Sequence, residues 1–314
     1  MGTNSRWLLF LFMIGAILIA MSPSGAQQPD SSIVVPVSTV VTVLGPKFTP
    51  PPALSKDDIG VREGEVRKDV ADWVPAQGDK AALELAILLD DADGKNVGKQ
   101  FDDLTNFIKS LPKSTSVGIF YANNNTISVA SQFSPDHEAV ARTLRLPLGS
   151  GLGASFYQSL MAMIAGWPVS GARREVLLLA DGYDRLRRER YSPDVETTVD
   201  KAQQAGVIVH AIFVNGAGTF SNRARRAVNI GQGNLNTITS GTGGQAFFQG
   251  LATPISFQPI LAQLDLVLKN QYFLGWTTNR ARNSKGELRG FKVSSERKDI
   301  EITAPKKIYV PGEK

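Results

Sequence analysis

The chain has 314 residues, a net charge of +5 and no cysteine. A hydrophobic content of 42% and a charged content of 20% are typical of a globular protein and exclude a disordered or fibrous chain. Without cysteine, the protein has no disulfide, no thiolate metal site and no cysteine nucleophile.

The first element along the chain is an apolar stretch at residues 7–21, preceded by Arg6 and followed by small residues at Ser24 and Ala26. This pattern is typical of a secretory signal peptide, here residues 1–26. The stretch is short for a membrane span of about 20 apolar residues, and an uncleaved anchor is the alternative. We expect a secreted or periplasmic protein with no membrane contact after cleavage. A bacterial source is favoured because the chain has no cysteine, whereas secreted eukaryotic modules more often carry disulfides.

Residues 27–80 predict an N-terminal β segment. The Val-rich stretch at 33–44 is interrupted by Pro36, which favours an edge strand. Residues 58–74 alternate between apolar and polar in short pieces, which predicts weak strands. A segment with so few strands is too small to be stable alone.

Residues 81–270 alternate between strand and helix patterns, which predicts a parallel sheet. The predicted strands are 83–89, 116–121, 126–133, 175–180, 207–214 and 245–248. The predicted helices are 98–111, 135–144, 156–165, 194–204 and 259–270. Glycines punctuate residues 215–244, so only a short helix near Leu235 is predicted there.

Residues 271–314 predict strands at 272–276, 291–294, 300–303 and 307–310, with no helix between them. Since neither β segment could stand alone, we expect the two to pair into a small β-sandwich with the α/β domain inserted between them. The predicted fold class is therefore α/β, a doubly wound, mostly parallel sheet with helices on both faces, plus this sandwich.

Two of the predicted strands end in acid. The first runs into Asp90-Asp91 and the fourth into Asp181. In an open α/β sheet, the loops at the carboxyl ends of the strands, here called the carboxyl rim, form the ligand crevice. If the two strands are neighbours, the carboxylates of Asp90 and Asp181 repel each other unless a cation or a donor lies between them. This pair is the first candidate site.

Four runs of sequence, at residues 101–108, 173–184, 205–209 and 242–248, accompany these acids and the glycine-rich loop between them. Together they resemble the von Willebrand factor type A (VWFA) domain, and in particular the VWFA-related secreted proteins of acidobacteria. The resemblance covers about residues 33–311. It implies a metal-ion-dependent adhesion site, in which Asp-x-Ser-x-Ser, a middle-loop Thr and a second Asp hold Mg²⁺ for a partner's carboxylate.

This chain departs from the family's ligand pattern. The two serine positions are Ala92 and Gly94, which have no side-chain oxygen, and the Thr position falls near Ala154, beside Ser155. Ser150 would take that position in another register of the loop. The resemblance therefore implies a degenerate adhesion site.

Asp90 and Asp181 remain as metal ligands, with Asp91, Asp93 and Ser155 as further candidates. No cofactor is certain, and Mg²⁺ would bind weakly. A looser Ca²⁺ site on the 90–96 loop is an alternative, although the calcium-loop pattern is only partly met. The simplest alternative is that these residues are solvated loop acids.

Two arginine clusters are expected on the carboxyl rim, and guanidinium groups bind carboxylates in bidentate fashion. We therefore predict an unknown, acidic protein partner. The predicted partner-binding residues are Tyr183, Asp184, Arg185, Arg187, Arg188, Arg223, Arg225 and Arg226. A solvated basic loop is the alternative. Nucleic acid is not expected, because few aromatic residues accompany the arginines.

Enzyme motifs are weak. The G-x-G-x-x-A run at 149–154 lacks the strand context of a dinucleotide site, and His210, in the middle of an apolar strand, is more typical of a core histidine. The sequence thus predicts a non-enzymatic binding module that mediates a protein–protein interaction through the carboxyl rim. A structural envelope protein with an inert rim is the alternative, and a metal-dependent hydrolase around Asp90, Asp91 and Asp181 is favoured less.

Overall fold

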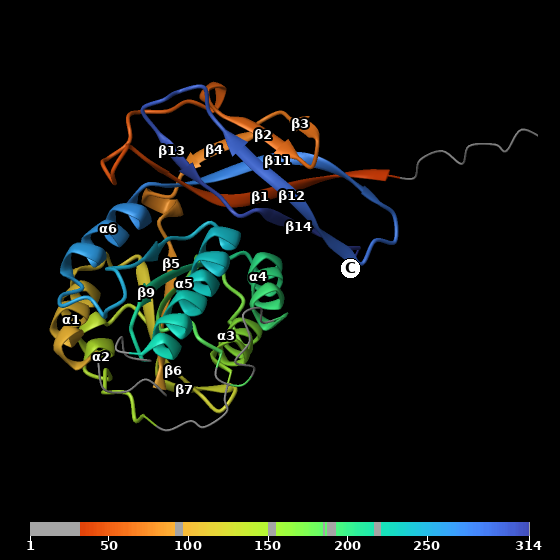
Figure 1. The fold of residues 1–314 in the computed structure, drawn as a ribbon. Helices are drawn as coiled ribbons and strands as arrows, with labels where there is room; N and C mark the ends of the chain where they lie inside the picture. The colour runs from red at the N-terminus through yellow and green to blue at the C-terminus, as the bar shows by residue number, and fades with distance from the viewer. Residues whose placement is uncertain are drawn as a thin grey trace, which may run out of the picture.

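The computed structural model describes residues 32–91, 97–149, 155–184, 186, 193–216 and 221–313. The predicted signal peptide lies outside the described residues. Figure 1 shows two parts, an α/β domain and a β-sandwich seated on one end of it. In the described part of the chain, no helix is both long enough and apolar enough to cross a membrane.

The central sheet has six strands in the order β10-β9-β8-β5-β6-β7. All pairings are parallel except that of β6 with the edge strand β7. The strands are β5 (Leu83–Asp90), β6 (Thr115–Asn123), β7 (Thr126–Ser134), β8 (Arg173–Ala180), β9 (Val207–Phe213) and β10 (Ala246–Phe247). The central strands are buried on both faces, which is why they read as continuous apolar runs.

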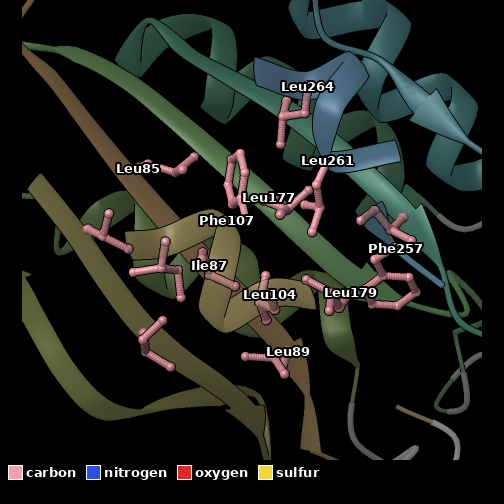
Figure 2. Close-up of a cluster of buried hydrophobic side chains, with 14 of the residues drawn as sticks. Leu85, Ile87, Leu89, Leu104, Phe107, Leu177, Leu179, Phe257, Leu261 and Leu264 are labelled. Atoms are coloured by element: carbon pink, nitrogen blue, oxygen red, sulfur yellow. The ribbon is translucent and has the colours of Figure 1, made fainter. Parts of the chain in front are cut away.

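Helices cover both faces of this sheet. They are α1 (Phe101–Ser110), α2 (His137–Ala141), α3 (Phe156–Ala165), α4 (Pro193–Ala205), α5 (Asn222–Thr242) and α6 (Gln258–Lys269). Leu85, Ile87 and Leu89 of β5 pack against α1 and α6 on one face (Figure 2). Ala86 and Leu88 point to the other face, where α3, α4 and α5 pack. The predicted doubly wound fold is confirmed.

The flanking segments form two four-stranded antiparallel sheets, in the orders β13-β1-β11-β4 and β14-β12-β2-β3. Strand β1 (Ser32–Leu44) pairs with β11 (Gln271–Ala281) from Ser32 opposite Ala281 to Thr42 opposite Gln271. The others are β2 (Gly60–Glu63), β3 (Val66–Lys68), β4 (Asp72–Pro75), β12 (Gly286–Ser294), β13 (Glu301–Thr303) and β14 (Lys307–Pro311). The two ends of the chain thus share one core, as the fold class predicts.

One sequence prediction is wrong. Residues 215–244 do not hold only a short helix, because α5 runs for 21 residues through three glycines. A Cβ at Gly231 would lie 2.0 Å from the carbonyl oxygen of Asp181, and a Cβ at Gly241 would lie 2.7 Å from Val199. These two glycines allow α5 to pack closely against the β8–α4 loop and against α4, instead of ending the helix.

Gly231→Ala is expected to destabilise the protein by about 1–3 kcal/mol, the usual cost of overpacking, because the clash is with backbone atoms. Gly233→Ala is the matched control on the same helix, since no atom lies within 4 Å of its Cβ position. That change should stabilise α5 by about 0.5–1 kcal/mol. Urea denaturation of both variants measures the difference, and equal effects would contradict the close approach.

A buried carboxylate joins the two sheets of the sandwich. Glu63 of β2 accepts hydrogen bonds from Trp276 Nε1 (2.9 Å), Thr278 Oγ1 (2.6 Å) and Arg289 Nη1 (2.7 Å). Burial raises the pKa of the Glu63 carboxyl, but these hydrogen bonds together lower it below its usual value. The ionised form is therefore the one that the fold stabilises.

Because its folded-state pKa lies below the ordinary value of 4.5, Glu63 stabilises the fold above about pH 4.5 and loses this effect as the pH falls through the lower folded-state value. Glu63→Gln should lower the free energy of unfolding by about 1–3 kcal/mol at pH 7. The difference from the parent protein should shrink towards pH 3. Glu287→Gln, which removes an exposed partner of the same Arg289, should cost less than about 1 kcal/mol.

Candidate functional site

The two strands that end in acidic residues, β5 and β8, are neighbours in the sheet. β5 pairs with β8 in parallel, with Leu89 opposite Leu179, so Asp90 ends one strand where Asp181 follows the other. Both side chains are buried. Burial raises the pKa of the nearby Tyr157 hydroxyl well above its usual value, and the negative charges of Asp181, Asp184 and Asp90 raise it further. Several carboxylates therefore surround one buried phenol on the carboxyl rim.

The loop that begins at Asp181 is held by its own side chains. Asp181 Oδ1 accepts from the Tyr183 backbone N–H (2.8 Å), and Asp184 Oδ1 accepts from the Leu186 N–H (3.0 Å). Tyr157 Oη and Asn234 Nδ2 both donate to the Gly182 carbonyl oxygen, the latter at 3.1 Å. Asp184 was predicted to contact a partner, but its carboxylate is buried and fixes the loop backbone.

Asp91 forms a clamp with a residue that the sequence analysis missed. Arg145 Nη1 and Nη2 donate to its two carboxylate oxygens at 2.8 and 3.1 Å, and the Leu148 N–H adds a third hydrogen bond at 2.8 Å. The guanidinium lies 3.7 Å from the ring centroid of Tyr121. Hydrogen bonding to Asp91 raises the pKa of Arg145 above its usual value. Asp91 therefore fixes the 145–149 loop.

Ser155 lies at the start of α3 on the same rim. Its side chain is fully buried, and its hydroxyl has no hydrogen-bond partner among the described residues. Its backbone N–H donates to Asn125 Oδ1 at 2.7 Å, in the turn between β6 and β7. A buried hydroxyl without a hydrogen bond lowers the stability of the fold, and the described contacts of Ser155 do not offset that loss.

The residues present fit a metal-ion-dependent adhesion site poorly. Within the described ranges, no group of three or more His, Asp or Glu side chains is arranged to hold a metal ion. Asp91 is occupied by Arg145, while Ala92, Asp93 and Gly94 lie outside the described residues. Asp90, Asp181 and the Ser155 hydroxyl are a thin donor set for an ion that prefers six oxygens.

The arginine predictions divide into two groups. Arg185, Arg187 and Arg188 lie outside the described residues. The second group is described, and all three of its members are exposed on the first turns of α5; they are Arg223, Arg225 and Arg226. Glu196 of α4 lines the same pocket as Arg225 and Arg226. Cations are unfavourable at a helix N-terminus, by a few tenths of a kcal/mol to about 1 kcal/mol. The helix dipole therefore gives no reason for their placement.

Exposed apolar side chains also gather on the carboxyl rim, a feature that the sequence analysis missed. Ile255 is 89% exposed and Leu148 is 67% exposed. The loop that carries Ile255 is fixed from both sides, because Gln100 Nε2 donates to the Pro254 oxygen (2.7 Å) and Asn215 Nδ2 donates to the Leu251 oxygen (2.6 Å). The rim's exposed large apolar residues are Leu146, Leu148, Leu186, Phe248, Leu251 and Ile255. No hydropathy pattern marks them, because they stand singly in loops.

Comparison with known proteins identifies no family. No protein-family model matches the sequence, and no curated protein matches it. Among solved structures, an aerotolerance-related membrane protein from Bacteroides fragilis is similar at 11% identity and a TM-score of 0.44, covering 60% of this chain and 98% of that one. The conserved hypothetical protein BatB from Bacteroides thetaiotaomicron gives 14% identity and a TM-score of 0.44, covering 60% and 100%. The VWA domain of SpRpn10 gives 13% and 0.36, covering 56% and 97%.

Arg145→Met should destabilise the protein by about 3 kcal/mol, because it leaves the Asp91 carboxylate buried without its countercharge. Adding Asp91→Asn should recover at least half of that loss, since the buried charge is then gone. The free energies of unfolding of the two single variants and the double variant form a cycle that isolates the pair. Strictly additive losses would contradict the clamp.

Proposed function

We propose that this chain is an exported, non-enzymatic binding module that recognises a partner protein through the carboxyl rim of its central sheet. Export rests on the apolar N-terminal stretch at residues 7–21 and the small residues that follow it. The rim is proposed because the sequence resembles VWFA domains and because loops at this edge are the usual binding surface of an open α/β sheet.

The observation that carries the proposal is the combination of exposed apolar and basic side chains on this one edge. Ile255 and Leu148 are well exposed on loops that hydrogen bonds hold in place. Arg223 and Arg226 lie exposed at the start of α5, where the helix dipole disfavours cations. Surfaces that combine exposed apolar groups with arginine are typical of protein interfaces.

The acids of the rim have a supporting role in this proposal. Asp91 and Asp184 hold the backbone of two rim loops in place, as their hydrogen bonds indicate. Asp90 and Asp181 are retained from a degenerate adhesion site, and recognition does not pass through a metal ion. The positive charge that attracts an acidic partner comes instead from guanidinium groups.

Site-specific photo-crosslinking in the cell that naturally makes the protein tests this proposal. A benzoylphenylalanine at Leu148, on the rim, should yield a covalent adduct with a discrete partner. The same group at Val66, which is 59% exposed on β3 of the sandwich, is the matched control and should yield none. Arg223→Glu together with Arg226→Glu should reduce the Leu148 adduct several-fold.

An inert rim gives a different result. A structural envelope protein would crosslink equally at Leu148 and Val66, or only at Val66, and the arginine changes would have no effect. Either pattern would contradict recognition through the carboxyl rim.

A further inference from the structure

A groove of about 470 Å³ lies at the other end of the central sheet, between the sandwich and the α/β domain. Residues 36–40 of β1 and 307–309 of β14 line one side, and the first residues of β8 and β9 line the other. Figure 1 shows β1 and β14 on the side of the sandwich that faces the α/β domain. The groove is therefore separate from the carboxyl rim.

The edge of β1 is open along this groove. Five consecutive residues of β1, 36–40, line the groove. Because successive side chains of a strand point to opposite faces, all five line the groove only if the backbone edge of the strand faces it. β1 pairs with β11 along its length, but β13 covers its other edge only from Thr42 to Leu44. Within the described residues, no strand pairs with that edge before Thr42.

The register shows which backbone groups are available. The Val43 N–H donates to the Asn270 oxygen at 2.9 Å, so the alternation of an antiparallel ladder directs the odd residues of β1 to β11 and the even residues to the groove. The N–H groups of Ser38 and Val40 therefore face outward. Pro36, which has no N–H, occupies the next outward position, as is usual on an open edge.

The charges that line the groove have one sign. Its charged residues are Arg173, Arg174 and Lys307, and no carboxylate is among the described residues that line it. Arg173 is buried, while Arg174 is half-buried and Lys307 is exposed beside Asp200, at 2.9 Å. The floor is apolar, with Val37 and Ile308 buried beneath it. The lining thus complements an extended segment that carries acidic and apolar side chains.

We propose that this groove binds an extended acidic segment of a partner polypeptide, which adds a short antiparallel or parallel strand to β1 between Pro36 and Thr42. Main-chain hydrogen bonds to Ser38 and Val40 hold the segment, and Arg174, which donates to the Ala205 and Pro168 oxygens and to no carboxylate among the described residues, selects its acidic side chains. Pro36 and the pairing of β13 at Thr42 limit the added strand to a few residues. This limit also protects the edge from indefinite pairing with other chains.

A fluorescein-labelled, end-blocked heptapeptide of alternating Glu and Val, mixed with the mature full chain, is the probe. Fluorescence anisotropy should show saturable binding with a Kd below about 1 mM, and the Lys/Val counterpart should bind at least tenfold more weakly. Ser38→Pro removes an outward N–H and should weaken binding at least about fivefold. Ser38→Ala keeps that N–H and should stay within about twofold of the parent protein.

Amide hydrogen exchange of the unaltered protein gives a second readout that does not depend on the folding of Ser38→Pro. The peptide should slow exchange at Ser38 and Val40, whereas Val41, which already pairs with β11, should be protected throughout. Failure of the Glu/Val peptide to bind, equal binding of the Lys/Val peptide, or unchanged exchange at both amides would overturn the proposal. So would a dimer of the free protein that Ser38→Pro dissociates, because the edge would then serve a second copy of this chain.

Discussion

The parallel pairing of β5 with β8 is the constraint on which the rest of the molecule depends. Both strands are buried on both faces, so helices must cover both faces of the sheet and the chain can become polar only where the strands end. This places Asp90, Asp91, Asp181 and Asp184 on one edge, largely removed from water. Buried carboxylates require donors, and Arg145 and nearby backbone N–H groups supply them. The hydrogen bonds that these carboxylates accept therefore fix the loops of the carboxyl rim.

Helix α5 relates the two ends of the domain. Its 21 residues span about 31 Å at 1.5 Å per residue, from the exposed arginines on the carboxyl rim to the sandwich. At its far end the Gly241 oxygen accepts from the Lys306 N–H at 2.9 Å. Gly231 lets the middle of the helix contact the Asp181 loop. One element thus fixes the position of the rim relative to the groove beside β1.

A buried polar network joins the sheet to the sandwich. Glu175 Oε2 lies 2.8 Å from His210 Nε2, and the Gln245 N–H donates to His210 Nδ1 at 3.1 Å, so Nε2 carries the proton that Glu175 accepts. Arg173 donates to the Gln271 side chain in β11 and to the Leu268 oxygen. Burial lowers the pKa of Arg173, although Glu175 opposes this. His210 is thus a paired core histidine, as its place in an apolar strand predicts.

Sequence patterns predicted what depends on local periodicity. The apolar runs that end in acid located β5 and β8, and the two strands predicted at 116–121 and 126–133 are joined by Asn124 and Asn125 with positive φ angles. Long-range packing was not predictable. In the sequence, Gly231 resembles a helix breaker. The close contact that requires a glycine there is with the Asp181 carbonyl, 50 positions away in the chain. Arg145 stood alone in the sequence, 54 residues from Asp91. Ile255 and Leu148 are exposed residues that stand singly in loops, so no hydropathy pattern predicts their exposure.

The central claim is that the carboxyl rim acts through side chains rather than through a bound metal ion. Thermal melting of residues 27–314 in EDTA, and then in millimolar Mg²⁺, Mn²⁺ or Ca²⁺, tests it most directly. A micromolar site saturated a thousandfold would add about 4 kcal/mol of stability and raise Tm by several degrees. We predict the same Tm, within about one degree, in EDTA and in each ion. A rise of several degrees with any one ion, lost in Asp181→Ala, would contradict the claim and restore the adhesion site as the functional centre.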